Sequence, residues 1–279
     1  MEHINHKAVS VLISVYEKEE PSYLKRALES LMEQECLPDE IVLVKDGRLG
    51  EELEGVISEF KERCPLLKLV ELPQNVQLGR ALARGLSSCS FELVARMDSD
   101  DIALPGRLLL QKRFMEANPD ISACGGNIAE FQEESEILRV KHMPQSNEAL
   151  RAYAKLRNPL NHMTVMFRKK DIEAVGGYLH FPGLEDYYLW SRLLAGGFKI
   201  ANLDEILVEA RLGRGFSHRR GGFAYFLGFC RLRNEQRRLG LLNPLEWLRA
   251  IFVSAIVCLA PAGLREGLYR MIRKKNKKE

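Results

Sequence analysis

Apolar segments of strand length alternate with amphipathic segments of helix length through the first hundred residues of this 279-residue chain. The first, AVSVLISVY at 8–16, is continuous and rich in β-branched residues, which is typical of a strand covered on both faces of a parallel sheet. A segment that opens with Pro-Ser and places leucines at helical spacing follows it. Further strands are predicted at 40–46, 67–72 and 91–98, and further helices at 51–62 and 78–89.

This alternation predicts an α/β fold built on a doubly wound, mostly parallel sheet. Such sheets bind ligands beyond the carboxyl ends of their strands, so the residues that follow each strand are the first candidates for a site. A nucleotide could bind at all four of the strand ends. The candidates are Glu17 after the first strand, Asp46 after the second, Gln74 and Asn75 after the third, and Asp98 to Asp101 after the fourth.

The chain changes in character toward its C-terminus. Beyond residue 120 the alternation loosens, and from residue 216 onward the sequence reads as helical. Residues 211–279 hold 16 Lys and Arg against 4 Asp and Glu, whereas residues 1–210 hold 25 against 34. We therefore expect an α/β domain over 1–212 and a helical, basic C-terminal extension over 213–279.

The basic C-terminal quarter indicates an anionic partner, either a membrane surface or a nucleic acid. The six cysteines show no Cys-x-x-Cys pair and no metal-binding spacing with histidine, which favours a reducing compartment. The N-terminal segment has too short an apolar run for a signal peptide. These features predict a cytoplasmic protein.

Three aspartates, Asp98, Asp100 and Asp101, lie within four positions in the segment ARMDSDDIALP. They could cap the helix that follows, although one acid would be enough for that. A calcium loop of the helix-loop-helix kind does not fit, because its ligand positions would fall on Ile102 and Leu109. A divalent cation shared with a bound diphosphate explains why several acids converge, since Mg²⁺ and Mn²⁺ bind carboxylate oxygens and leave positions for phosphate oxygens.

Five blocks of the sequence resemble, in this order, the inverting family 2 glycosyltransferases with the GT-A fold. An Asp-x-Asp motif alone would be weak evidence, but five blocks in register across residues 8–212 are a specific signal. The resemblance implies transfer of a sugar from a UDP-sugar to a hydroxyl of a saccharide acceptor, with Mn²⁺ or Mg²⁺ as cofactor. The blocks are VSVLISVYE, DEIVLVKDG, NVQLGRALARGL, ARMDSDDIALPGRL and GLEDYYLWSRL.

The resemblance also implies roles for individual residues on the donor side. Tyr16 and Glu17 would lie near the base and ribose, and Asp46 would bond to the uracil. Gly79 and Arg84 would lie along the nucleotide. Without the block order, Glu17 reads as a surface acid and Asp46 as a turn residue.

The same resemblance assigns the metal site. Asp98 would face the ribose and share the cation with Asp100, and Asp101 would be a supporting or capping residue. His218 could complete the metal shell or contact the diphosphate, together with the two arginines that follow it. A basic, solvated loop is the alternative for that segment.

Inversion by a single displacement needs a general base within about 3 Å of the acceptor hydroxyl. Glu185 and Asp186 lie at the start of a predicted helix, where acids are common because they favour helix N-termini. The resemblance implies that Asp186 is the base, that Glu185 contacts the acceptor and that His162 lies near the site. The glycines of VGGY at 175–178 suit a cover over the acceptor or a simple turn.

Residues 250–264 carry no charged side chain. As a helix they would span about 22 Å, short of the about 30 Å hydrocarbon core of a bilayer. With the Lys/Arg-rich end of the chain, this segment favours peripheral attachment to an anionic membrane at its inner face. The resemblance implies an acceptor linked to polyprenyl diphosphate there. A buried helix that closes the domain is the alternative, and a nucleic-acid partner is not expected because the elements of known modules are missing.

Two other functions are compatible with a nucleotide-binding sheet. A sugar nucleotidyltransferase would carry a glycine-rich loop after the first strand, and VYEKEEPS contains no glycine. A non-catalytic, membrane-associated protein that binds nucleotide-sugars would not require a second acid pair at Glu185 and Asp186. The transferase therefore accounts for more of the sequence than either alternative.

Overall fold

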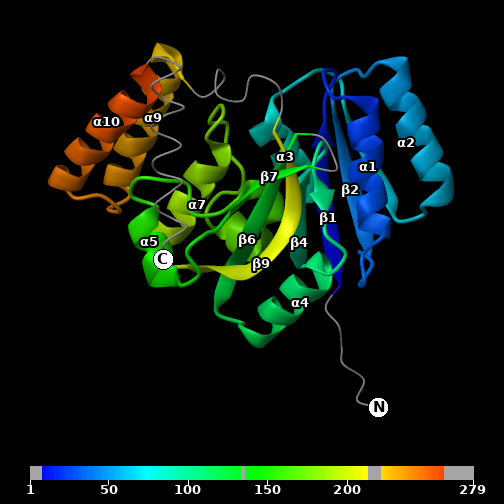
Figure 1. The fold of residues 1–279 in the computed structure, drawn as a ribbon, viewed down its shortest axis with the longest axis horizontal. Helices are drawn as coiled ribbons and strands as arrows, with labels where there is room; N and C mark the ends of the chain where they lie inside the picture. The colour runs from blue at the N-terminus through cyan, green and yellow to red at the C-terminus, as the bar shows by residue number, and fades with distance from the viewer. Residues whose placement is uncertain (1–7, 133–135, 213–220, 261–279) are drawn as a thin grey trace.

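The fold is built on one nine-stranded sheet with helices packed on both of its faces (Figure 1). It is seen in a computed structural model that describes residues 8–132, 136–212 and 221–260. The doubly wound α/β architecture predicted from the sequence is confirmed.

The N-terminal half of the sheet consists of parallel strands joined by helices. Its strands lie side by side in the order β3-β2-β1-β4, and every pairing among them is parallel. Their carboxyl ends therefore lie at one edge, as the alternation predicts. The elements are β1 (Val9–Val15), α1 (Pro21–Met32), β2 (Glu40–Asp46), α2 (Glu51–Arg63), β3 (Leu67–Leu72), α3 (Leu78–Ser88) and β4 (Leu93–Asp98).

The C-terminal half of the sheet is mixed. Its elements are β5 (Ile102–Ala103), α4 (Arg107–Ala117), β6 (Ile121–Phe131), β7 (Ile137–Lys141), α5 (Asn147–Tyr153), η1 (His162–Thr164), β8 (Met166–Arg168), α6 (Lys169–Ala174), α7 (Glu185–Ala195) and β9 (Lys199–Arg211). β8 lies antiparallel between β4 and β6, and β9 runs parallel to β6. β5, which directly follows the aspartate loop, pairs with β9. This pairing brings the end of β9 beside that loop.

Alternation along β1 explains why both faces of the sheet are covered. Val11 and Ile13 face one core cluster, where they pack with Leu28 of α1, whereas Leu12 faces the other cluster with Leu82 of α3. Each such side chain is buried completely or nearly so, and contributes roughly 1.5–3 kcal/mol to folding. The continuous apolar run of β1 is therefore required by a strand with no solvent-facing side.

Two further helices, α9 (Phe223–Arg238) and α10 (Pro244–Leu259), pack at the end of the molecule beyond α7 (Figure 1). Arg233 of α9 is buried, and its guanidinium donates to the Tyr187 hydroxyl of α7 at 2.8 Å. Gln236 is also buried and donates to the Ser191 hydroxyl at 2.9 Å. These buried polar contacts fix α9 to the α/β body, since leaving such groups without partners would cost free energy.

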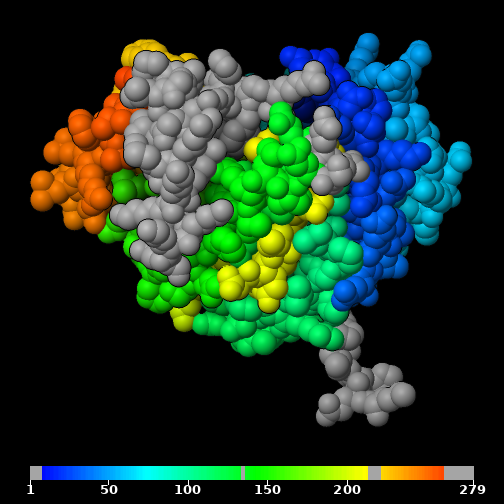
Figure 2. Space-filling model, in the orientation of Figure 1, coloured from blue at the N-terminus to red at the C-terminus, as the bar shows by residue number. Residues whose placement is uncertain are grey.

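Helix α10 presents a different surface. Its N-terminus is closed by a capping box between Asn243 and Glu246, and its small residues face inward. Its outward face carries large, exposed apolar side chains; the helix is the orange segment at the left of Figure 2. Within the described residues, no helix is both long and apolar enough to cross a membrane. The exposed residues are Leu245, Leu248, Phe252, Ile256 and Leu259.

Candidate active site

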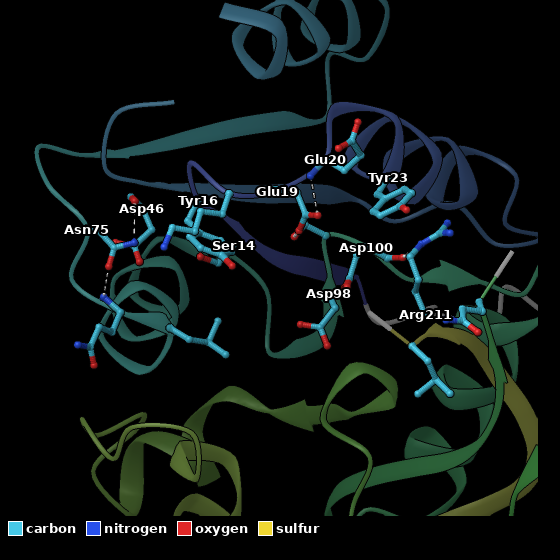
Figure 3. A pocket seen from close by; sticks show the side chains of 16 residues that line it. Ser14, Tyr16, Glu19, Glu20, Tyr23, Asp46, Asn75, Asp98, Asp100 and Arg211 are labelled. Atoms are coloured by element: carbon cyan, nitrogen blue, oxygen red, sulfur yellow. Dashed lines mark hydrogen bonds between the residues drawn. The ribbon is translucent and has the colours of Figure 1, made fainter. Parts of the chain in front are cut away.

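A cavity of about 970 Å³ opens where β1, β2 and β4 end (Figure 3). Five residues predicted from the sequence line it, namely Tyr16, Asp46, Asn75, Asp98 and Asp100. They lie at or after the ends of four different strands, whose carboxyl ends the parallel sheet brings to one edge. The cavity is therefore the position where this fold is able to bind a ligand.

Asp46 anchors one wall of the cavity. Its carboxylate accepts a hydrogen bond from the Val76 backbone amide at 2.7 Å, and the Asn75 side chain donates to the Asp46 carbonyl at 3.4 Å. Gly47 has φ +93°, and a Cβ atom there would lie 2.7 Å from the Asn75 backbone nitrogen. Only glycine fits this close approach. The turn after β2 and the loop before α3 are thereby held together.

Glu19, which the sequence prediction did not single out, lines the cavity, whereas Glu17 does not. The chain turns after β1, and the Glu19 amide donates to the Tyr16 carbonyl at 3.1 Å. This turn leaves Glu17 exposed and returns Glu19 over the sheet, where it accepts a bond from the Ser99 hydroxyl. Burial raises the pKa of Glu19. Only the geometry of the turn selects among the glutamates that follow β1.

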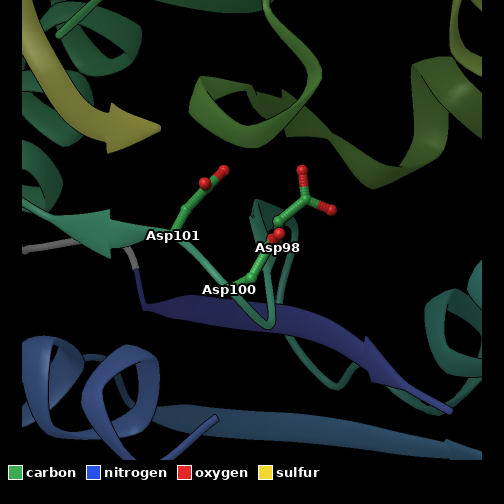
Figure 4. A group of neighbouring side chains, drawn as sticks. All are labelled: Asp98, Asp100 and Asp101. Carbon is green, nitrogen blue, oxygen red and sulfur yellow. The ribbon is translucent and has the colours of Figure 1, made fainter. Parts of the chain in front are cut away.

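Asp98, Asp100 and Asp101 bring carboxylate oxygens within 4.8 Å of one another (Figure 4). Burial, together with the charges of Asp98 and Glu19, raises the pKa of Asp100 to about 7. Burial and the neighbouring aspartates also raise the pKa of Asp101. Like charges gathered in a buried place cost free energy, so the cluster attracts a cation.

A divalent cation fits this cluster. The donors are all carboxylate oxygens, the ligand type that Mg²⁺ and Mn²⁺ prefer. Asp101 accepts from the Arg211 amide through Oδ1 at 2.7 Å, but its buried Oδ2 has no hydrogen-bond partner among the described residues. A buried carboxylate oxygen without a hydrogen-bond partner indicates a site for a bound ion or ligand.

Arg211 brings positive charge to the same cavity from the end of β9. Its Nε donates to the Asp100 carbonyl at 3.1 Å, and its guanidinium lies 3.8 Å from the centre of the Tyr23 ring and 4.5 Å from that of Phe131. A stacked guanidinium held this way suits a phosphate oxygen. The sequence prediction missed Arg211, because its position depends on the pairing of β9 with β5.

The second acid pair lies at the N-terminus of α7, as the sequence predicts. Glu185 is buried, and burial followed by the charge of Asp186 raises its pKa to about 7. Asp186 accepts from the Asn158 side-chain amide at 2.5 Å and from the Tyr187 backbone amide at 2.7 Å. The two neighbouring carboxylates thus have different environments, one desolvated and the other held by donors.

Gly79 of α3 lies directly against this acid pair. A Cβ atom at position 79 would lie 3.3 Å from the Glu185 Cβ and 2.9 Å from the Leu179 carbonyl oxygen. The preceding residues Gln77 and Leu78 line the cavity. The glycine therefore allows the start of α7 to approach the rim of the cavity.

Arg96 and Tyr178 connect the aspartate cluster with the pair on α7. The buried Arg96 guanidinium forms an ion pair with Asp98. Burial raises the pKa of Tyr178, Arg96 lowers it, and the charges of Asp186, Glu185 and Asp98 raise it. The acids that raise the pKa of Tyr178 thus come from both acid groups.

Three other predicted residues have different environments. His162 is buried and bonds through Nε2 to the Tyr178 hydroxyl at 2.9 Å, and burial lowers its pKa. Arg84 is exposed on α3 and lies outside the lining of the cavity. His218 lies outside the described residues. The loop beside Tyr178 is fixed by Arg192, which donates to the Gly177 carbonyl at 2.6 Å.

Comparison with known proteins gives close relatives over nearly the whole chain. A Haemophilus influenzae protein named as an uncharacterized glycosyltransferase is 41% identical over 95% of this chain and 99% of its own. The amylovoran biosynthesis glycosyltransferase AmsE of Erwinia amylovora is 37% identical over 95% of this chain and 99% of its own. The Escherichia coli UDP-Gal:α-D-GlcNAc-diphosphoundecaprenol β-1,3-galactosyltransferase is 33% identical over 94% of this chain and 95% of its own.

Solved structures share the fold at lower identity. The Pyrobaculum calidifontis mannosyltransferase PcManGT, in complex with GDP-Man and Mn²⁺, superposes with a TM-score of 0.65 at 19% identity, over 90% of this chain and 70% of its own. Residues 1–349 of S. aureus TarS, in complex with UDP-GlcNAc, superpose with a TM-score of 0.65 at 18% identity, over 89% of this chain and 72% of their own. The family model "Glycosyl transferase family 2" matches residues 10–175. The chain therefore belongs to glycosyltransferase family 2 and is a glycosyltransferase with the GT-A fold.

Proposed function

We propose that this chain is a metal-dependent, inverting glycosyltransferase that moves a sugar from a UDP-sugar to a hydroxyl of a saccharide acceptor. The observation that carries the proposal is that the second acid pair lies beside the cavity of Asp98 and Asp100, because a Cβ at Gly79, which follows the lining residue Leu78, would lie 3.3 Å from the Glu185 Cβ. A transferase of this kind needs acids at the donor phosphates and an acid at the acceptor, on either side of the reacting carbon. A role in polysaccharide biosynthesis is supported by the amylovoran biosynthesis in the name of the Erwinia relative.

The donor occupies the cavity at the strand ends in this proposal. Asp46 and Tyr16 hold the uracil end, and Asp98 faces the ribose. Glu19 takes the position that the sequence assigned to Glu17, because it lines the cavity. Arg211 is positioned for the diphosphate. A UDP-sugar is supported by the UDP-GlcNAc bound to TarS and by the UDP-Gal in the name of the E. coli relative.

Asp98 and Asp100 would hold Mn²⁺ or Mg²⁺, with His218 as a further proposed ligand. When bound, such a cation offsets the negative charge that develops on the leaving diphosphate. The Arg96 ion pair orients the Asp98 carboxylate. The Mn²⁺ in the PcManGT structure supports this assignment.

Asp186 acts as the general base. It takes the proton of the acceptor hydroxyl while the hydroxyl oxygen forms the new bond to the anomeric carbon, and the bond from that carbon to the diphosphate breaks on the opposite face. The donors Asn158 and the Tyr187 amide hold its carboxylate in one orientation. Glu185, with its pKa raised to about 7, contacts the acceptor's other hydroxyls.

We also propose residues 213–279 as a membrane-associating extension of the 1–212 domain. The apolar face of α10, formed by Leu245, Leu248, Phe252, Ile256 and Leu259, is exposed, and Arg249 lies next to Leu248 in the sequence. Apolar side chains with flanking arginines suit the interface of an anionic bilayer. An acceptor linked to polyprenyl diphosphate is supported by the name of the E. coli relative.

The test is UDP release from a panel of UDP-sugars with Mn²⁺, measured with and without saccharide acceptors. The wild-type chain should release UDP from one donor, faster when its acceptor is present. Asp186→Asn should lose about 10²–10⁴-fold in transfer and keep the slow donor hydrolysis, because only the acceptor's proton needs this base. Glu173→Gln, at an exposed carboxylate on α6, is the matched control. Transfer by Asp186→Asn at the wild-type rate would contradict the assignment.

A further inference from the structure

A second cavity, of about 510 Å³, lies between the loop at residues 179–181 and the face of α9. We infer that this groove binds the diphosphate and the adjoining lipid of a prenyl-diphosphate-linked acceptor. The inference rests on the proposed function and specifies where the acceptor's non-sugar part lies. Three features of the groove support it, namely its position, its charge and the apolar stripe that leads away from it.

The groove begins next to the acid pair on α7. Leu179 lines the groove. A Cβ at Gly79 would lie 2.9 Å from the Leu179 carbonyl oxygen and 3.3 Å from the Glu185 Cβ, so Leu179 and Glu185 lie close to the same point. Tyr188, another lining residue, stands three positions after Glu185, one turn along the same helix face. On the α9 side, a Cβ at Gly228 would lie 3.6 Å from the side chain of Leu184, the residue before Glu185. A sugar beside Glu185 would therefore have its substituent at the mouth of this groove.

The groove is basic. Arg231 and Arg238 of α9 line it together with His180, and Glu235 is the single acid of its lining. Glu235 forms an ion pair with Arg238 at 2.6 Å. In the part of the chain that the structure describes, Arg231 has no ion-pair partner. Arginines bind phosphate oxygens through two parallel N–H groups, so Arg231 suits a diphosphate, and Arg238 adds a second guanidinium along the same helix face.

The same face of α9 becomes apolar toward its N-terminus. Phe223, Leu227 and Arg231 follow one another at four-residue spacing, which places them along one side of the helix. Phe223 is 65% exposed and Leu227 is 43% exposed. From Arg231 to Phe223 the face extends about 12 Å along the helix axis. A basic end that continues into an exposed apolar stripe matches a charged head with a hydrocarbon tail, and not a fully polar ligand.

The test measures binding of farnesyl diphosphate to the full chain, with saturating UDP and Mn²⁺ present to occupy the first cavity. The wild-type chain should bind it at least about tenfold more tightly than inorganic diphosphate or farnesol. The double variant Arg231→Ala/Arg238→Ala should lose at least about tenfold in affinity, because each charge-assisted bond contributes more than a neutral one. Phe223→Ser/Leu227→Ser should weaken farnesyl diphosphate and leave inorganic diphosphate unchanged.

Arg237→Ala is the matched control, because it removes the same charge from the same helix at a residue that stacks on Trp247 outside the groove. Wild-type affinity in the double variant would overturn the inference. So would equal affinity for farnesyl diphosphate and inorganic diphosphate, or full competition by a single-stranded oligonucleotide. Binding needs no turnover, so its failure is separate from that of the proposed function, which would appear as absent UDP release.

Discussion

The guanidinium of Arg96 is ion-paired with the carboxylate of Asp98, two positions further along the same strand. Residues two apart on a strand point to the same face, so β4 itself sets this pair. Arg96 is 2% exposed, and its Nε and Nη1 have no hydrogen-bond partner among the described residues. A buried cation of this kind is stabilised mainly by its acid neighbours. It orients the Asp98 carboxylate, which lines the cavity.

Removing the Arg96 charge should therefore destabilise the protein and impair donor binding together. We expect Arg96→Met to lower the free energy of unfolding by about 3–5 kcal/mol, the cost of breaking a buried pair. Chemical denaturation measures this, and Asp98→Asn added to Arg96→Met should recover part of the loss. Arg113→Met, at an exposed arginine of α4, should change stability little. If the changes in the free energy of unfolding caused by Arg96→Met and Asp98→Asn simply added in the double variant, the two residues would not be coupled.

Asp100→Ala should lower turnover far more than donor affinity. The cluster loses a carboxylate that would hold the cation, and removing one group that stabilises developing charge costs about 10²–10³ in kcat. The rise in melting temperature that Mn²⁺ gives the wild-type protein should also disappear. Asp120→Ala, at an exposed aspartate, should keep the wild-type turnover and the rise in melting temperature with Mn²⁺. An Asp100→Ala protein with wild-type Mn²⁺ response would remove this residue from the metal site.

Glu19 and Glu17 form a natural matched pair, because they carry the same charge two positions apart. Glu19 lines the cavity and accepts from Ser99, whereas Glu17 is exposed. We expect Glu19→Ala to raise KM for the UDP-sugar by about tenfold or more, the loss of one good polar contact. Glu17→Ala should stay within about twofold. The reverse order of effects would return the role to Glu17.

The raised pKa of Glu185, about 7, makes a prediction about stability and pH. Between its ordinary pKa and 7, the folded protein binds more protons at this group than the unfolded chain does, so this carboxyl lowers stability as pH rises through that window. Glu185→Gln should therefore stabilise the protein by roughly 2 kcal/mol at pH 8 and by much less at pH 5. Denaturation of both proteins at the two pH values measures the difference. If Glu185→Gln changed the free energy of unfolding by the same amount at pH 5 and at pH 8, the pKa of Glu185 would not be raised.

The exposed face of α10 should control attachment to membranes. We expect Leu248→Ser/Phe252→Ser to reduce flotation with anionic vesicles severalfold, because each substitution removes apolar area that would enter the interface. Leu37→Ser, at an apolar residue about half exposed elsewhere on the surface, is the control. Flotation of the double variant with anionic vesicles at the wild-type level would mean that this face does not contact lipid.

Local patterns in the sequence were enough to predict the N-terminal half of the fold. The strands predicted at 40–46 and 67–72 coincide with β2 and β3, and the helix predicted at 51–62 differs from α2 by one residue. Burial on both faces demands a continuous apolar run, and helical burial demands leucines at helical spacing. The aspartate cluster was visible for the same reason, since its members are adjacent in the chain and follow a strand.

Contacts between distant segments decided the rest. Arg211 reaches the cavity because β9 pairs with β6, where Phe131 is its partner, and with β5, more than a hundred residues earlier in the chain. Glu19 replaces Glu17 there because of one turn hydrogen bond, and the groove forms where α9 meets the loop at residues 179–181. Periodicity reports which side of an element is buried, but not which other element covers it. That choice depends on packing across the whole molecule, so it became visible only in three dimensions.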